Sequence, residues 1–166
     1  FVMGALQEAH SLGAKTIFIT CNPNPDGIPD IDVVIHLLVG PELITGSTRM
    51  KSGTATKMVL NMMTTTAMIR IGKVYQNLMV DLKTTCNKLK HRSVRIVTML
   101  TNLPKSQVEQ LLQDANGSVK TALVMHFCGI KRKQAEKLIR KQRGRIQDII
   151  PSGSNPSNAD IPLQID

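Results

Sequence analysis

The order of apolar and polar positions predicts an α/β arrangement in the first third of the chain. Residues 1–12 carry apolar side chains at helical spacing, and Gly13 follows as a stop signal. Residues 15–20 and 32–38 are short, nearly continuous apolar runs, separated by a segment rich in Pro, Asn and Asp. Such runs are typical of buried parallel strands. We therefore expect a parallel sheet flanked by helices.

A long helix is expected next, from about Thr48 to Ile71, and Gly72 ends it. Its apolar composition predicts that it is buried. Residues 73–81 form a connector or short extended piece, and residues 82–101 are predicted as a second helix, amphipathic in pattern. Four methionines of the long helix fall on helical spacing, which favours core packing over a cofactor site: Met58, Met62, Met63 and Met68.

The pattern changes after Asn102, and three short helices follow. They are predicted from Pro104 to Asp114, over residues 119–128 after a Ser118 cap, and over residues 131–142. Three short helices in so few residues predict a small bundle that resembles a ubiquitin-associated (UBA) domain.

Three domains follow from these patterns. Residues 1–101 are expected to form part of an α/β sheet domain, and residues 102–150 a small helical domain. Residues 151–166 are rich in Pro, Ser and Asn, which predicts a disordered tail. No apolar run reaches the roughly 20 residues that a membrane helix needs, so we expect no membrane partner.

Composition narrows the classes of ligand. The net charge of +9 is spread over both halves of the 166 residues and suits a polyanion or a small phosphorylated ligand. Aromatic residues are only 2%, which argues against a protein that stacks nucleic-acid bases. The three cysteines and four histidines show no metal-binding spacing, and no P-loop or dinucleotide fingerprint occurs. We therefore expect no metal or nucleotide cofactor.

The segment GPELITGSTRMKSGTATK, residues 40–57, is the strongest candidate for chemistry. Ser47 or Thr48 is a suitable N-cap for the long helix, and Arg49 and Lys51 place positive charge beside its N-terminus. Free backbone N–H groups there would complete an anion site. The alternative is a well-capped helix whose basic side chains lie in water.

Glu42 in the same segment also has two interpretations. It pairs with Arg49 to hold the loop, which we favour, or it serves as an acid/base group near a ligand.

Two further basic features lie in the helical part. Ser118 and Lys120 stand at a capped helix start and form a second candidate anion site, with simple capping and a solvated lysine as the alternative. Residues 131–145 hold eight basic residues and one acidic residue. A solvated helix face is the usual meaning of such a run, and an acidic partner or nucleic acid is the minority interpretation.

Four stretches of this sequence together resemble N-acetylmuramic acid 6-phosphate etherases. The signature region corresponds to GPELITGSTRMKSGTATKMVLNM at residues 40–62 and IGKVYQNLMVDLKTTCNKL at residues 71–89. Residues 5–25, ALQEAHSLGAKTIFITCNPNP, and residues 116–125, NGSVKTALVM, also fit. The resemblance covers roughly residues 1–150.

The resemblance implies a sugar-isomerase-type (SIS) α/β domain with a helical lid. It implies a cytoplasmic homodimer that needs no metal or nucleotide and cleaves the lactyl ether of N-acetylmuramic acid 6-phosphate. The products would be N-acetylglucosamine 6-phosphate and D-lactate, formed by elimination and then addition of water.

The resemblance also implies roles for particular residues. Glu42, Ser47, Thr48, Arg49 and Lys51 would line or brace the sugar site, and Ser118 and Lys120 would touch a bound sugar phosphate. The family's two acid/base glutamates are expected upstream of Phe1, so we expect this chain to be inactive alone. A related alternative is a non-catalytic sugar-phosphate regulator that resembles the glucokinase regulatory protein.

Overall fold

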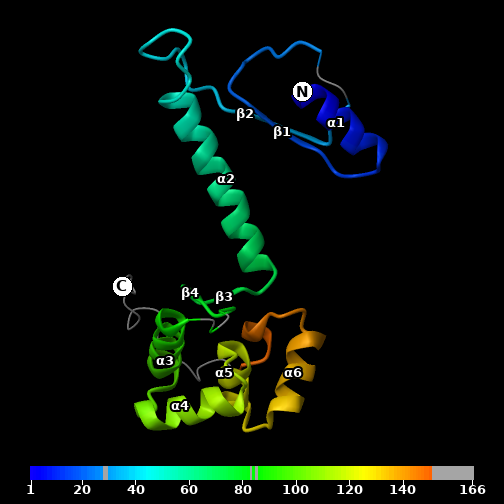
Figure 1. Cartoon of the computed structure of the whole chain (residues 1–166). Coiled ribbons are helices and arrows are strands. Elements are labelled where there is room, and N and C mark those ends of the chain that lie inside the picture. Colours follow the sequence, from blue (N-terminus) through cyan, green and yellow to red (C-terminus); the bar gives the residue numbers. More distant parts are fainter. Residues whose placement is uncertain (28–29, 83, 85, 151–166) are drawn as a thin grey trace. The chain divides into compact units, whose positions relative to one another are not determined.

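The computed structural model describes residues 1–27, 30–82, 84 and 86–150. It divides into two compact units, residues 1–64 and residues 65 onward, and each is described by itself (Figure 1). The predicted disordered tail, residues 151–166, lies outside the described residues. Within those limits the chain is α/β, with six α-helices and a short parallel sheet. This arrangement is compatible with part of a SIS-type fold.

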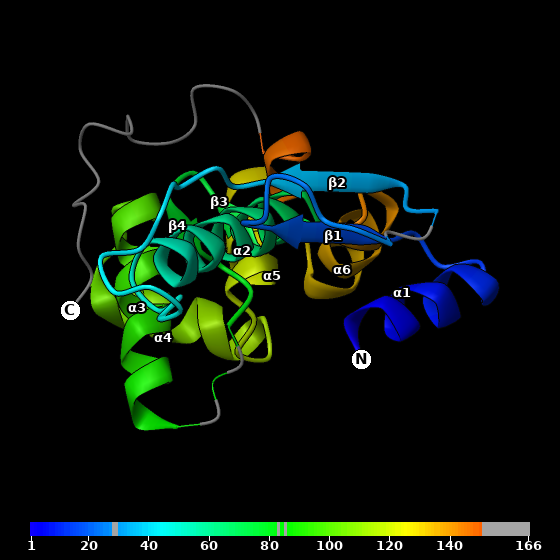
Figure 2. The same ribbon diagram turned by 90° about the horizontal axis from the view of Figure 1, so that it is seen from above.

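The first unit contains the expected parallel strands. Helix α1 (Val2–Ser11) precedes β1 (Ile17–Thr20), and β2 (Val33–His36) follows. The strands run side by side, in parallel register from Ile17 opposite Val33 to Thr20 opposite His36 (Figure 2). The prediction of a helix followed by two parallel strands is therefore confirmed.

Asp32 ties the start of β2 to the residues before β1. Its carboxylate accepts hydrogen bonds from the Lys15 ammonium and from the backbone N–H and hydroxyl of Thr16. The bond from Lys15 and then the N–H of Thr16 lower the pKa of Asp32 to about 2. Thr16 is the one buried residue among those described in this unit, so this polar link lies at its best-enclosed described point.

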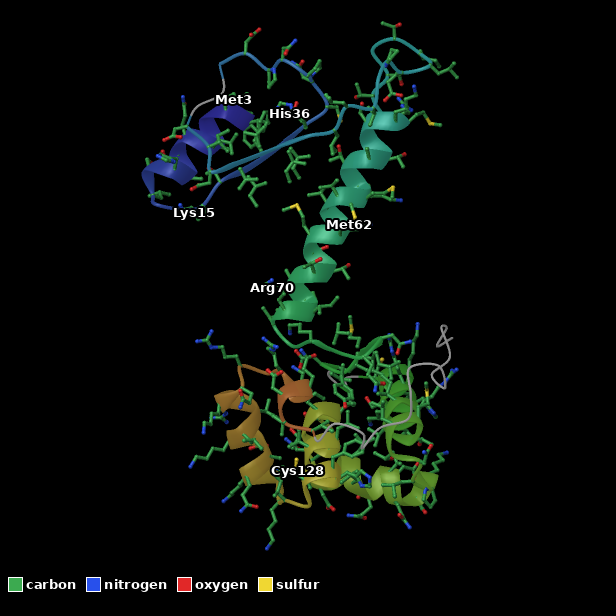
Figure 3. All side chains as sticks on the ribbon, turned by 180° about the vertical axis from the view of Figure 1, so that it is seen from behind. Met3, Lys15, His36, Met62, Arg70 and Cys128 are labelled. Atoms are coloured by element: carbon green, nitrogen blue, oxygen red, sulfur yellow. The ribbon has the colours of Figure 1, made fainter. Side chains whose placement is uncertain are left out.

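The prediction that the two strands and the long helix are buried is wrong for this chain. Ile17 in β1 and Val33 in β2 are 46% and 47% exposed. Helix α2 (Lys51–Arg70) contains no buried residue, and Met58, Met62 and Met68 on it are exposed; Figure 3 labels Met62. Two strands and one helix have too few neighbours to cover their own apolar faces. The methionines have the spacing of a buried helical stripe, but in this structure they do not form a core.

The second unit is a helical body with a small hairpin. Strands β3 (Val74–Tyr75) and β4 (Leu78–Met79) pair antiparallel, so the connector predicted over residues 73–81 is a hairpin. Four α-helices and a short 3-10 helix follow it. These helices are α3 (Asn87–Thr101), α4 (Lys105–Asp114), α5 (Val119–Cys128), α6 (Arg132–Lys141) and η1 (Ile146–Asp148).

Helix α5 lies at the centre of this unit. Its residues from Val119 to Val124 are all buried, and Leu123 is fully enclosed. Helices α3, α4 and α6 pack against it. Helix α3 therefore shares a compact unit with the helices that follow it. The sequence-based domain boundary after residue 101 stays a prediction for the whole protein.

Local signals for the ends of these helices are confirmed. Pro104 and Ser118 are the N-caps of α4 and α5, and Gly129 ends α5 in the left-handed conformation. Helix α3 begins at Asn87, later than the predicted residue 82.

A close glycine contact links the segment before β3 to the loop after α6. Both Gly72 and Gly144 have positive φ angles, +75° and +84°. A Cβ atom on Gly72 would lie 2.5 Å from the carbonyl oxygen of Gly144. The two backbones can approach this closely because Gly72 has no side chain.

Candidate functional site

Glu42 organises the start of helix α2. Its Oε1 accepts a hydrogen bond from the backbone N–H of Ser52, and its Oε2 accepts one from the N–H of Lys51, both at 3.0 Å. The N–H of Ser52, and then that of Lys51, lowers the pKa of Glu42 below its ordinary value of 4.5. A carboxylate at this position also suits the positive end of the helix dipole. Glu42 is therefore ionised at neutral pH and holds the loop on the helix.

The predicted N-cap is wrong, because α2 begins at Lys51 rather than at Thr48. Glu42 performs the capping that was assigned to Ser47 or Thr48. The first four N–H groups of α2 all donate within the chain: Lys51 and Ser52 to Glu42, Gly53 to the Thr48 carbonyl, and Thr54 to the Met50 carbonyl. The free N–H groups expected for an anion site are thus occupied by the chain itself.

The prediction that Glu42 pairs with Arg49 is also wrong, because no such ion pair forms in the described part of the chain. Both carboxylate oxygens of Glu42 are engaged by backbone N–H groups instead. The Lys51 ammonium donates a hydrogen bond of 2.8 Å to the Pro41 carbonyl oxygen. This bond braces the loop from its other side. Arg49 is exposed and forms none of these contacts, so its guanidinium is the loop cation that remains available to an anion.

An open hollow of about 450 Å³ lies along the first turns of α2. Hydroxyl, amine and amide side chains line it together with a glycine and a leucine: Thr48, Ser52, Gly53, Thr56, Lys57, Leu60 and Asn61. Of these, only Thr48 was named from the sequence as a candidate ligand residue, although four others belong to the candidate segment 40–57. The signal that could have found the others is the spacing of hydroxyls four residues apart, which places them on one helix face.

The hollow lies next to the carboxyl end of β1. The Sγ of Cys21, which directly follows that strand, is 3.9 Å from both the Ser52 carbonyl and the Thr56 hydroxyl. Ligands of open parallel sheets bind outside the carboxyl ends of the strands. The loop from Gly40, the hollow and the end of β1 therefore form one candidate binding edge within the first unit.

Ser118 and Lys120 belong to the second unit. The Ser118 hydroxyl accepts from the N–H of Thr121 at 3.2 Å, so the predicted cap is confirmed. Lys120 is not the solvated lysine of the alternative interpretation, because it is only 8% exposed. Its Nζ lies 3.6 Å from Asp81, which also accepts a hydrogen bond from Lys73.

Burial governs the electrostatics of this cluster. Burial lowers the pKa of Lys120, although the charge of Asp81 opposes the shift. Burial would raise the pKa of Asp81, but the bond from Lys73 and the charge of Lys120 leave it lowered. The cluster brings the side-chain nitrogens of Lys73 and Lys120 to the single carboxylate of Asp81.

The candidate residues thus fall into two groups that the structure describes separately. Glu42, Ser47, Thr48, Arg49 and Lys51 share one loop in the first unit. Ser118 and Lys120 lie in the second unit. Their convergence on one ligand stays a prediction. In the described ranges, no group of three or more His, Cys, Asp or Glu side chains could hold a metal ion, and no helix could cross a membrane.

Acid should release the start of α2. A carboxylate whose folded pKa is lowered contributes stability above its unfolded pKa, and that contribution is lost as the pH falls through the folded value. We expect the amide NMR signals of Lys51 and Ser52 to titrate with a midpoint below pH 4.5. In Glu42→Gln this titration should be absent. A midpoint at or above 4.5 in the unmodified chain would contradict the capping role.

Comparison with known proteins places these residues in a family. No family model matches the chain. It is 48% identical to N-acetylmuramic acid 6-phosphate etherase 1 of Bacillus licheniformis over 147 residues, which are 89% of this chain and 48% of the relative.

Two other curated relatives agree. The etherase of Photorhabdus laumondii is 47% identical over 90% of this chain and 50% of its own length. That of Rhodopirellula baltica is 46% identical over 93% and 51%. The chain spans about half the length of the curated relatives it matches. On this similarity it belongs to the family of N-acetylmuramic acid 6-phosphate etherases.

Proposed function

We propose that this chain is part of an enzyme that cleaves the lactyl ether of N-acetylmuramic acid 6-phosphate. The products are N-acetylglucosamine 6-phosphate and D-lactate, and the alternative is a non-catalytic sugar-phosphate regulator. The observation that carries the proposal is the similarity to named etherases, at 46–48% identity over about nine tenths of the chain.

The geometry supports a binding role for the loop after β2. Arg49 is exposed beside a helix start, and a guanidinium can hold a phosphate or carboxylate through two parallel hydrogen bonds. In this proposal Arg49 grips the anionic group of the substrate, while Ser47 and Thr48 bind its hydroxyls. Lys51 braces the loop through Pro41.

Glu42 is proposed as a positioning residue. Elimination needs a base that removes the proton next to the sugar carbonyl and an acid that protonates the leaving ether oxygen. A group whose pKa is lowered and whose two oxygens accept backbone hydrogen bonds suits neither task well. Glu42 therefore holds the loop in this proposal, and it is the resemblance to the etherases that implies two acid/base glutamates outside these 166 residues.

Further features of the family enter as parts of the same proposal. The sheet and α2 would belong to a SIS-type domain, and α4, α5 and α6 to a UBA-like lid. Ser118 and the cationic cluster around Lys120 would meet the sugar phosphate from that lid. The working enzyme would be a cytoplasmic homodimer without metal or nucleotide.

The test is D-lactate release from N-acetylmuramic acid 6-phosphate by the full-length parent protein. Arg49→Ala is expected to lower kcat/KM by on the order of 100-fold, because a charge-assisted contact to the substrate is lost. Arg70→Ala, an exposed arginine at the far end of α2, is the matched control and should change kcat/KM by less than about twofold.

Two results would count against the proposal. No D-lactate release from a well-folded parent that still binds the sugar phosphate would favour the regulator. Equal activity of Arg49→Ala and Arg70→Ala would leave an enzyme in place but remove the loop from its binding site.

A further inference from the structure

The hollow of about 450 Å³ beside helix α2 has one cation among its lining residues, Lys57. The other lining residues carry a hydroxyl, an amide or an aliphatic side chain, or are glycine, and none of them is Asp or Glu. Helix α2 contains no acidic residue between Lys51 and Arg70. In the described part of the chain, Lys57 is exposed and its ammonium has no hydrogen-bond or ion-pair partner. Its charge is therefore available to an anion that enters the hollow.

The side chains around Lys57 differ in polarity. Leu60 and Asn61 stand three and four residues after Lys57, so all three share one face of the helix. Leu60 is 48% exposed, which leaves its side chain open to a ligand. Thr56 adds a hydroxyl to the same hollow. A ligand group that fits these side chains combines one negative charge with a small apolar substituent.

The lactyl group of N-acetylmuramic acid 6-phosphate has this composition. Cleavage of its ether gives D-lactate, so the group carries one carboxylate and one methyl beside the ether oxygen. A carboxylate has one negative charge, which a single lysine can balance. A phosphate monoester carries about 1.5 to 2 negative charges at neutral pH, so a single lysine balances it less completely.

We propose that this hollow binds the lactyl group of the substrate, with Lys57 on its carboxylate. The inference rests on the proposed function and assigns the two anionic ends of the substrate to different residues. Leu60 contacts the lactyl methyl, and the amide of Asn61 donates a hydrogen bond to the carboxylate. Arg49 is not among the lining residues of the hollow and is left for the phosphate. The hollow thereby distinguishes the substrate from N-acetylglucosamine 6-phosphate, which has no lactyl group.

The test removes the charge from one end of the substrate. The two compounds compared are N-acetylmuramic acid 6-phosphate and its lactamide, in which a neutral primary amide replaces the carboxylate. The full-length parent protein is assayed for release of lactate or lactamide, and kcat/KM is measured for each compound. Comparing protein variants on the same pair of compounds cancels any intrinsic difference in reactivity between the two ethers.

Lys57→Met is the decisive substitution, because it removes the charge and keeps an unbranched side chain. We expect kcat/KM for the acid to fall about 30-fold and kcat/KM for the lactamide to change by less than about threefold, since only the acid offers a charged partner to the lysine. Lys57→Arg should keep the preference for the acid. Lys137→Met, at an exposed lysine of α6, is the matched control and should leave both values within about twofold.

The outcomes separate this inference from the proposed function. Arg49→Ala should lower kcat/KM for both compounds alike, because both carry the phosphate. Equal losses on the two compounds in Lys57→Met, or no loss on either, would overturn the lactyl site while leaving the enzyme in place. A parent that releases neither product would contradict the proposed function, and Kd values from calorimetry would then replace kcat/KM. Equal binding of the two compounds, or binding of neither, would overturn the lactyl site in that case as well.

Discussion

Gly72→Ala should destabilise the second unit by about 3 kcal/mol. The added Cβ would lie 2.5 Å from the carbonyl oxygen and 2.6 Å from the carbonyl carbon of Gly144, both of them backbone atoms that cannot rotate away. Overpacking of this kind costs roughly 1–3 kcal/mol, and a left-handed φ costs a non-glycine residue about 1–2 kcal/mol more. Chemical denaturation followed by helical circular dichroism would measure the loss.

Gly129→Ala is the matched control for this prediction. Gly129 also has a positive φ, +63°, but nothing lies within 4 Å of the Cβ position. The substitution should lower the free energy of unfolding only by the cost of a left-handed φ for alanine, about 1 kcal/mol. Equal losses for the two variants would show that the contact between Gly72 and Gly144 contributes nothing.

Leu123→Ala should cost about 3–4 kcal/mol in the same experiment. Leu123 is fully enclosed on α5, the helix against which α3, α4 and α6 pack, so truncation leaves a cavity among residues that other contacts hold in place. Removal of a buried leucine side chain in this way destabilises proteins by roughly 2–5 kcal/mol.

Leu60→Ala is the comparison that tests the exposure of α2. Leu60 is 48% exposed, so its truncation in the 166-residue chain should change the stability by less than about 0.5 kcal/mol. A loss as large as that of Leu123→Ala would mean that α2 is covered in solution. The same substitution in a full-length relative, where more of the family's sequence is present, is a direct further check.

Much of the local structure follows from the sequence. The two apolar runs before and after the Pro-rich segment become β1 and β2, because apolar runs of this length bounded by turn residues favour strands. Ser118 and Gly129 bound α5, since a hydroxyl can cap the first turn and a glycine can adopt the left-handed conformation at its end.

Burial is where the sequence alone is misleading. The methionine pattern of α2 predicts a core, yet Met58 and Met62 are exposed. A helical repeat of apolar residues shows which face would be buried, but a neighbour has to be present to bury it. The same reason applies to Ile17 and Val33, which remain about half exposed because little packs on the faces of the two-stranded sheet in the described part of the chain.

The candidate site also has one part that the sequence predicted and another that it did not. The sequence of residues 40–57 was enough to identify an Arg- and Lys-containing loop at the start of a helix. It did not show that Glu42, nine residues before Lys51, would occupy the N–H groups of that helix and leave Arg49 exposed. A cap from outside the usual spacing depends on how the loop folds back, which local pattern does not encode.

The sequence by itself indicated most of the helices and strands of this chain and its family, and it supplied the candidate ligand residues that remain predictions. These depend on neighbouring residues, whose spacing can be read along the chain. Only the tertiary structure decided that Lys120 is buried beside Asp81 and that Gly72 meets Gly144 across the second unit. Such contacts join residues far apart in sequence, and their energies depend on distances that exist only once the chain has folded.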